Sequence, residues 1–388
     1  MHAEIRMARI VEAVGLYKTG KVTCEQAAEW LGVSERHFRR LRDRYEAEGA
    51  EGIIDRRRGR ASGRRAPADQ VEWMLEQYMT RYFDFTVKHF HEEISKRGFV
   101  YSYSWTKMML YRSGLVRPKR KHSVHRKKRV RRPLPGMMLF QDGSTHEWLV
   151  GQPPLDLIAT LDDATSEIYS IFLVEQEGTA STFRGLAETI GKKGLFSSFY
   201  TDRGSHYFFT PKAGEKVSKE QLTQVGRALA ELGIRHIPSY SPEARGRMER
   251  VWGTLQQRLP PLLRLEEITS VEAANRFLAE VYIVEHNDRF AVAPEAEDTA
   301  FVPFVGDLAG VLCVKHERVV GNDNCVRFDN LDLQIPEQRH RRHYVKATVQ
   351  VRQYADGALS IFHGPRRLAD FAPDGTPITE GASRQSAA

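Results

Sequence analysis

Apolar residues near the start of the chain recur at the spacing of amphipathic helices. In "CEQAAEWLGVSERHFRRLRDRYEAEG", residues 24–49, Ala28 lies four positions before Gly32, and Phe38 and Leu41 follow at helical spacing. This pattern indicates a helix-turn-helix, in which the alanine lies where two helices cross, the glycine makes the turn and Ser34 caps the second helix. A plain helical hairpin fits the apolar spacing too, but it has no need for the arginines on the outer face.

That outer face carries hydrogen-bond donors suited to a DNA major groove, namely Arg36, His37, Arg39 and Arg40. Residues 67–116 repeat the helical pattern, ending in "SWTKMMLYRSG". We expect a second, winged helix-turn-helix there, with Lys107 and Arg112 outward and Met108, Leu110 and Tyr111 available for packing. DNA contact by this second unit is assigned mainly from its neighbours.

From residue 136 the pattern becomes that of a mixed α/β domain. The apolar strand "MMLFQDGS" ends at Asp142, the hairpin "LDLIATLDDATSEIYSIFLV" and a helix follow, and "GLFSSFYTD" is a further strand ending at Asp202. After another helix and a short strand, Met248, Trp252, Leu255 and Leu259 form a helical stripe beside Glu249.

The last part of the chain reads as short strands, with "YADGAL" as a hairpin turn, and we expect a small β-barrel. Its "RHRRH" run, residues 339–343, serves either DNA binding or solubility. The fold class is therefore multidomain, with all-α helix-turn-helix units, an α/β core and a β-barrel. The expected boundaries are 1–55 (helix-turn-helix), 56–66 (basic linker), 67–116 (second helix-turn-helix), 117–135 (basic linker), 136–297 (α/β core), 298–372 (barrel) and 373–388 (disordered tail).

Charge supports a polyanionic partner through its placement more than through the net charge of +8. The run "RRRGRASGRR" holds six arginines, and "RPKRKHSVHRKKRVRR" holds ten lysines or arginines, and neither contains an acid. One such run is usually a solvated surface, but two at domain boundaries favour linkers that follow DNA phosphates. The residues concerned are Arg56, Arg57, Arg58, Arg126, Lys127, Lys128 and Arg129.

The remaining composition favours a cytoplasmic protein. Three cysteines without a CxxC spacing argue against a disulfide framework or a zinc site. The chain has no run of apolar residues long enough to span a membrane, and its start lacks the continuous apolar stretch of a signal peptide.

"SFYTDRGSHY" places Asp202 directly after a strand and Gly204 two positions later, and Asp and Gly at such a position usually make a turn. Asp142 at the end of an earlier strand and Glu249 on a later helix change that interpretation, because all three acids can converge at one sheet edge. Carboxylates packed closely repel one another unless cations bind, and oxygen ligands suit Mg²⁺ or Mn²⁺. Two such ions about 4 Å apart can activate a water or a 3′ hydroxyl and stabilise the leaving oxygen in phosphoryl transfer.

Other polar residues near these acids have weaker claims. Asp162 and Asp163 match hairpin-turn chemistry, Glu243 is a first-turn helix acid, and His206 either orients a phosphate or closes a turn. Three arginines crowd the helix of Glu249, and we expect them to contact the DNA backbone: Arg245, Arg247 and Arg250.

The segments "FQDGSTHEWL", "LDDATSEIYSIF", "YTDRGSHYF", "SYSPEARGRMERVWGTLQQRL" and "VEHNDRFAVAP" resemble, in this order, the catalytic core of DDE transposases of the retroviral integrase superfamily. They are most similar to the ISNCY-type bacterial insertion-sequence enzymes, over about residues 135–294. The resemblance implies a ribonuclease H-like core and an acidic triad of Asp142, Asp202 and Glu249. The 46 residues between Asp202 and Glu249 exceed the usual interval of the family, and we place the extra length in "YFFTPKAGEKV", residues 207–217.

The expected function is a DNA transposase that binds the ends of its element and carries out metal-dependent strand cleavage and transfer. Its cofactor would be Mg²⁺ or Mn²⁺, with two ions per active site. Its partners would be double-stranded DNA, from the terminal repeats and the target, and further copies of the chain in a dimer or larger multimer. The alternatives are a DNA-binding regulator with an inactive core and a metal-dependent nuclease.

Overall fold

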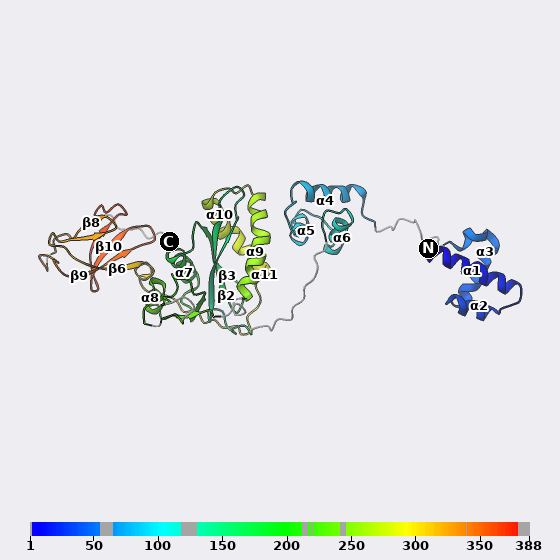
Figure 1. The fold of residues 1–388 in the computed structure, drawn as a ribbon, viewed down its shortest axis with the longest axis horizontal. Coiled ribbons are helices and arrows are strands. Elements are labelled where there is room, and N and C mark those ends of the chain that lie inside the picture. Colours follow the sequence, from blue (N-terminus) through cyan, green and yellow to red (C-terminus); the bar gives the residue numbers. More distant parts are fainter. Residues whose placement is uncertain are drawn as a thin grey trace. The chain divides into compact units, whose positions relative to one another are not determined.

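The computed structural model describes residues 2–54, 65–117, 130–211, 216–218, 220–240, 246–338 and 340–378. The chain forms two compact units, residues 1–73 and 74–388, each with its own core. Figure 1 shows the elements in chain order. Among the described residues, no helix combines the length and apolar character needed to cross a membrane.

The first unit is helical and matches the helix-turn-helix prediction. Its elements are α1 (His2–Lys18), α2 (Cys24–Leu31), α3 (Glu35–Glu48) and the 3₁₀ helix η1 (Gly49–Ile53). Gly32 ends α2 with a left-handed φ of 64°, a conformation that favours glycine, and the Ser34 side chain accepts a hydrogen bond from the His37 backbone N–H to cap α3. Ala28, Phe38 and Leu41 are buried, as the apolar spacing predicted.

The second helical group consists of α4 (Ala68–Thr80), α5 (Val87–Lys96) and α6 (Tyr103–Arg112). Met74, Phe90, Ile94 and Leu110 are fully buried between these helices. Residues 65–117 contain no strand, so the expected wing is not present in this described segment. Met108, which we expected to pack, is 38% exposed.

A five-stranded mixed sheet forms the α/β core and confirms the predicted central domain. Its strands are β1 (Leu139–His146), β2 (Leu155–Asp162), β3 (Ile168–Val174), β4 (Ser198–Thr201) and β5 (Arg235–Pro238), arranged in the order β3-β2-β1-β4-β5. The first three strands are antiparallel, whereas β4 runs parallel to both β1 and β5. Strand β1 is thus hydrogen-bonded on both edges.

Helices cover both faces of this sheet. They are α7 (Thr179–Lys193), α8 (Gln224–Glu231), α9 (Gly246–Leu265), α10 (Val271–Phe277), the π-helical turn η3 (Leu278–Tyr282) and α11 (Ile283–Phe290). One core joins Phe140 of β1 to the α9 stripe, and the other joins Leu139 and Phe199 to α7 and α8. Because side chains alternate along a strand, the even-numbered positions of β1 face α9.

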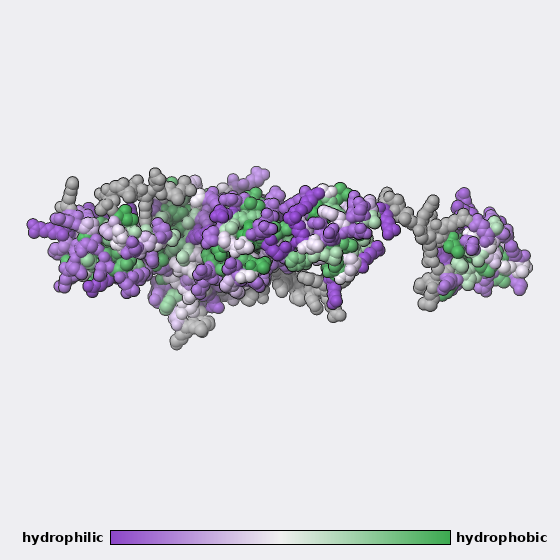
Figure 2. All heavy atoms as spheres, turned by 90° about the horizontal axis from the view of Figure 1, so that it is seen from above, coloured by the Kyte–Doolittle hydropathy of each residue, from purple (hydrophilic) through white to green (hydrophobic). Residues whose placement is uncertain are grey.

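The C-terminal part contains α12 (Leu308–Val311), β6 (Val314–Val319), β7 (Cys325–Phe328), β8 (Leu331–Gln334), β9 (Thr348–Gln353), β10 (Leu359–His363) and β11 (Arg366–Phe371). The predicted short strands form an antiparallel sheet in the order β11-β10-β9-β6 and a separate β7-β8 pair. Within the described residues these sheets stay open rather than closing into a barrel. Val326, Leu333, Val351 and Ile361 fill their shared core, and polar residues cover most of the visible face of this part, at the left of Figure 2.

Candidate active site

The register of the central sheet brings two of the predicted acids to neighbouring positions. Leu139 pairs with Phe199 and Phe140 pairs with Tyr200, so partners on β1 and β4 differ by 60 positions. The same offset places Asp142 beside Asp202, one residue past the end of β4. Parallel strands lie about 4.8 Å apart, so the two residues lie close together, and the Asp142 carboxylate is on the face covered by α9.

Helix α9 contacts Asp142 through Trp252. The Trp252 indole Nε1 donates a hydrogen bond to Asp142 Oδ2 at 3.0 Å, and Asp142 is only 8% exposed. Further along α9, Gln256 Nε2 donates to Ser144 Oγ at 3.1 Å. Glu249 is exposed and precedes Trp252 by three positions, which is about one helical turn. The third predicted acid is therefore carried by the helix that contacts Asp142.

Asp202 begins a tight local turn and is half-buried. Its Oδ1 accepts a hydrogen bond from the Gly204 backbone N–H at 2.8 Å. The backbone N–H groups of Tyr207 and Phe208 both donate to the Gly204 carbonyl oxygen at 2.9 Å. The turn chemistry expected of Asp-x-Gly is therefore present, and it orients the Asp202 carboxylate.

Tyr207 and Glu177 lie beside these aspartates, and our reading of the sequence missed both residues. Burial raises the pKa of the Tyr207 phenol well above its ordinary value, and the negative charges of Glu177, Asp142 and Asp202 raise it further. The Tyr207 hydroxyl lies 3.3 Å from Glu177 Oε1. Gly143 offered a sequence signal, because a glycine inside a strand often marks a close approach of another group.

The donor chemistry of the three predicted acids suits a divalent cation, since carboxylate oxygens are the ligands that Mg²⁺ prefers. The Trp252 indole donates a hydrogen bond to the buried Asp142 carboxylate and so fixes its orientation. Within the ranges given above, no three His, Cys, Asp or Glu side chains are placed to hold a metal ion together. The structure thus brings Asp142 and Asp202 together and carries Glu249 on the adjoining helix, without closing a three-carboxylate cluster.

Asp162 and Asp163 have structural partners, in agreement with their interpretation as turn residues. Asp162 Oδ1 accepts from the backbone N–H groups of Ala164 and Thr165, and its Oδ2 accepts from the Gly136 N–H. Burial raises the pKa of Asp162, although these hydrogen bonds oppose the shift. The completely buried Asp163 pairs with Arg247, which is itself mostly buried. Arg247 is therefore not available as the DNA contact that we expected.

The other expected DNA-contacting residues lie on α3, on α6, on α9 or outside the described ranges. On α3, Arg36, His37, Arg39 and Arg40 are exposed, and Arg39 forms an ion pair with Glu35 at 2.7 Å. On α6, Arg112 is exposed, whereas Lys107 is half-buried between the rings of Tyr103 and Tyr111. Arg250 on α9 is exposed. The residues that lie outside the described ranges are Glu243 and, among the expected contacts, Arg56, Arg57, Arg58, Arg126, Lys127, Lys128, Arg129 and Arg245.

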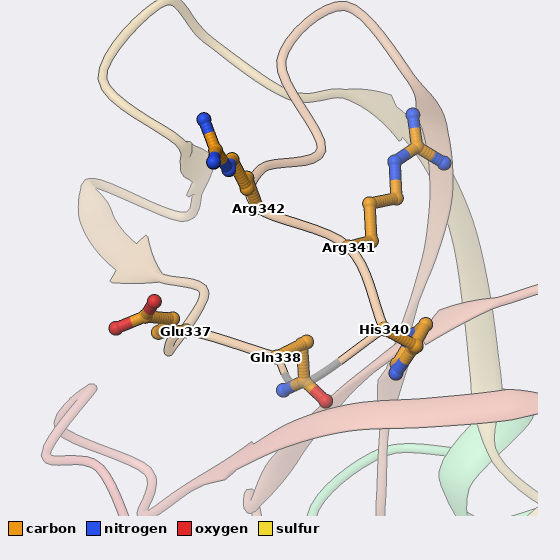
Figure 3. A pocket seen from close by; sticks show the side chains of 5 residues that line it. All are labelled: Glu337, Gln338, His340, Arg341 and Arg342. Atoms are coloured by element: carbon orange, nitrogen blue, oxygen red, sulfur yellow. The ribbon is translucent and has the colours of Figure 1, made fainter.

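His340, Arg341 and Arg342 of the C-terminal part line a pocket of about 490 Å³. Figure 3 shows Glu337, Gln338, His340, Arg341 and Arg342 along one loop around this pocket. Arg341 Nε donates to the His343 carbonyl oxygen, and its guanidinium lies 4.5 Å from the centre of the Tyr344 ring. Local contacts thus hold Arg341 within its own loop.

Comparison with known proteins agrees with this arrangement. Residues 11–72 match a family model described as a winged helix-turn helix. The putative transposase y4bF of Sinorhizobium fredii is 30% identical over 356 residues, which cover 90% of this chain and 77% of that protein. The transposase for insertion sequence IS1202 of Streptococcus pneumoniae is 26% identical over 366 residues, covering 85% of this chain and 78% of that protein.

Two solved structures also align with the chain. The catalytic core domain of HTLV-2 integrase, in complex with magnesium, covers 38% of this chain and 89% of its own at 16% identity and a TM-score of 0.29. The simian T-cell lymphotropic virus intasome, in complex with a PP2A regulatory subunit, covers 75% and 91% at 16% identity and a TM-score of 0.32.

A transposase 30% identical to this chain spans nearly all of it, and the helix-turn-helix, the mixed α/β core and the C-terminal sheets occur in the order that the sequence motifs implied. The chain therefore belongs to the DNA transposases, which are enzymes of the polynucleotidyl transferase type.

Proposed function

We propose that this transposase cuts and joins DNA strands at a divalent-metal site formed by Asp142, Asp202 and Glu249. The observation that carries the proposal is the parallel register of β1 and β4, which sets Asp142 beside Asp202. The hydrogen bond from the Trp252 indole to Asp142 brings α9, the helix that carries Glu249, next to Asp142. A carboxylate within β1, one just past the end of β4 and one on α9 would thus act together from distant parts of the chain.

Each acid has a distinct structural role in this proposal. Asp142 is fixed by the sheet and by Trp252, Asp202 is oriented by the Gly204 N–H, and Glu249 approaches from the exposed side of α9. Two bound Mg²⁺ or Mn²⁺ ions would activate the attacking hydroxyl and stabilise the leaving oxygen of the phosphodiester. The protein supplies the hard oxygen ligands and holds them in place before DNA arrives.

The helix-turn-helix of the first unit supplies DNA recognition. The exposed basic residues of α3 fit a major groove, and we propose that they read the terminal repeats of the element. Because two ends are joined to one target, we expect the DNA-bound form to be a dimer or a larger multimer, acting at the nucleoid in the cytoplasm.

Substitution of the three acids tests the catalytic proposal. Asp142→Asn, Asp202→Asn and Glu249→Gln should each abolish joining of a 3′-hydroxyl DNA end in magnesium, because each removes a charged ligand. Binding to a cognate end should stay within about threefold of the parent, since α3 is unchanged. Asp288→Asn, at an exposed acid of α11, is the matched control and should join normally.

The same assay separates the alternative functions. A nuclease would cut the end without joining it to a target, and a regulator with an inactive core would bind the end without cutting it. Substantial joining by any one of the three variants would remove that residue from the site.

A further inference from the structure

We propose that Tyr207, Glu177 and His206 form a latch that positions the Asp202 turn against strand β1. We call these three side chains the Tyr207 latch. The inference rests on the proposed function, because it assigns to the latch the task of setting the separation of Asp142 and Asp202. None of its members is proposed to touch a metal ion or DNA.

The Tyr207 hydroxyl joins two segments of the core. It lies 3.1 Å from Gln141 Oε1 and 3.3 Å from Glu177 Oε1, and the residue is 1% exposed. Gln141 immediately precedes Asp142 on β1, while Tyr207 follows Asp202 by five positions. One hydroxyl therefore connects the segment that carries the first aspartate to the segment that carries the second.

The Tyr207 hydroxyl is the hydrogen-bond donor to Gln141 and Glu177. Both nearby oxygens accept hydrogen bonds, and the phenol has a single proton to share between them. Burial and the surrounding carboxylates keep that phenol protonated. The His206 ring lies 3.9 Å from the Tyr207 ring, centre to centre, and its Nε2 is 3.6 Å from Glu177 Oε1. His206 is thus placed to complete the environment of the Glu177 carboxylate.

Contacts with β1 and β2 fix the position of Glu177. Its backbone N–H donates to Asp156 Oδ2 at 2.7 Å, while Asp156 Oδ1 accepts from the Thr145 hydroxyl at 2.5 Å. A Cβ atom on Gly143 would lie 2.6 Å from Glu177 Oε2, closer than side-chain packing permits. The glycine next to Asp142 therefore makes room for this carboxylate.

The turn needs such a connection because strand pairing does not extend to it. Strand β4 ends at Thr201, and the backbone N–H groups of Gly204, Tyr207 and Phe208 donate to acceptors within residues 202–208. Thr223 Oγ1 donates to the Tyr207 carbonyl oxygen at 2.9 Å, which ties the turn toward α8. The link toward β1 runs through the Tyr207 hydroxyl.

Tyr207→Phe removes this hydroxyl and is the first test. Tyr169→Phe is the matched control, because Tyr169 is also buried and its hydroxyl donates to a glutamate, Glu167, at 3.2 Å. In the metal-free full chain, amide hydrogen exchange at Tyr207 and Phe208 should accelerate roughly tenfold in Tyr207→Phe and stay unchanged in Tyr169→Phe. Joining should fall by about tenfold in Tyr207→Phe alone, with unchanged binding to the cognate DNA end.

Glu177 variants separate hydrogen bonding from charge. Glu177→Gln keeps an oxygen that accepts from Tyr207, so joining should stay within about threefold of the parent. Glu177→Ala removes this contact but leaves the Tyr207 contact with Gln141, so joining should fall by more than about threefold and by less than in Tyr207→Phe. Equal losses in Glu177→Gln and Glu177→Ala would overturn a positioning role based on the hydrogen bond.

Failure of the latch can be told from failure of the active-site proposal. Normal exchange and joining in Tyr207→Phe, together with an inactive Asp142→Asn, would reject the latch and keep the triad. A fully active Asp142→Asn would reject the triad itself, whatever the exchange data show.

Discussion

At the scale of single residues, Arg247 shows how a basic side chain near an active site can serve the fold. Its guanidinium pairs with Asp163, a carboxylate at the end of the β2 turn that is completely buried. The backbone N–H of Arg132 donates to the other oxygen of the same carboxylate at 2.8 Å. Burial makes such a pair costly to break from one side, because the remaining charge stays out of water.

Arg247→Ala should therefore lower the free energy of unfolding by about 3 kcal/mol, since it leaves the Asp163 charge without its cation. Arg250→Ala, at an exposed arginine of the same helix, should change it by less than about 0.5 kcal/mol. Urea unfolding of the two full-length variants measures both values. Equal stabilities would mean that the Arg247 pair contributes nothing to the fold.

Single residues also show what sequence reasoning can reach. Asp202 follows the apolar strand β4, a position visible in the pattern, whereas β1 continues past Asp142 to His146, beyond the end that the sequence predicted. The resemblance identified Glu249 as the companion of the two aspartates. Glu177 could not be identified, because "VEQEGTA" places it in a polar stretch beside Glu175 with no periodicity to distinguish the two. Only the folded sheet shows that Gly143 leaves space for it.

At the scale of elements, α3 and the basic linkers were expected to bind DNA in different ways. The apolar spacing and Ser34 predicted α3 correctly, and the structure places its arginines on the exposed face. Arg39 shares its charge with Glu35 through an ion pair, while Arg36 and Arg40 lie on the same exposed surface. Base reading is thus expected chiefly from Arg36 and Arg40.

Arg36→Ala and Arg40→Ala should each weaken binding to the cognate end by about 1–3 kcal/mol and affect random DNA much less, because base contacts carry the specificity. A variant with alanine at Arg126, Lys127, Lys128 and Arg129 should weaken both DNAs alike and flatten the plot of log affinity against log salt by roughly 0.9 unit per lost phosphate contact. Binding over a salt series measures these effects. Loss of cognate binding alone in the linker variant would reverse the two assignments.

Other elements show where local patterns stop being informative. Strand and helix positions in the core follow from apolar periodicity, which burial enforces directly. Apolar periodicity does not distinguish the π-helical turn η3 from the helices α10 and α11 on either side of it. It also does not tell whether the C-terminal strands close into a barrel. Closure depends on how distant strands meet, and nearest-neighbour sequence does not contain that information.

At the scale of the whole molecule, His286 on α11 makes stability depend on pH. The residue is 3% exposed, and burial, with the nearby Arg258 charge, lowers its pKa to about 4. An unfolded chain binds this proton near pH 6.5, so between these two values the unfolded state holds more protons than the folded state. The contribution of His286 is complete above pH 6.5 and is lost as the pH falls toward 4.

His286→Phe keeps an aromatic ring beside Phe290 and removes the titration. Its stability should therefore fall less steeply between pH 6.5 and 4, by up to about 1.4 kcal/mol per pH unit. Urea unfolding followed by tryptophan fluorescence at several pH values measures the slope. His37→Asn, at an exposed imidazole of α3, is the control and should follow the parent. Parallel curves for His286→Phe and the parent would contradict the prediction.

The position of β1 between β2 and β4 has a consequence for how this enzyme can evolve. Asp142 belongs to a strand paired on both edges, so a change of its backbone disturbs two neighbours at once. Asp202 follows a strand end, and side chains hold its turn. Variation that retunes activity while preserving the fold should therefore accumulate at residues 203–208 and around Glu177. Strand β1 would remain nearly constant while the rest of the active site adapts to new element ends.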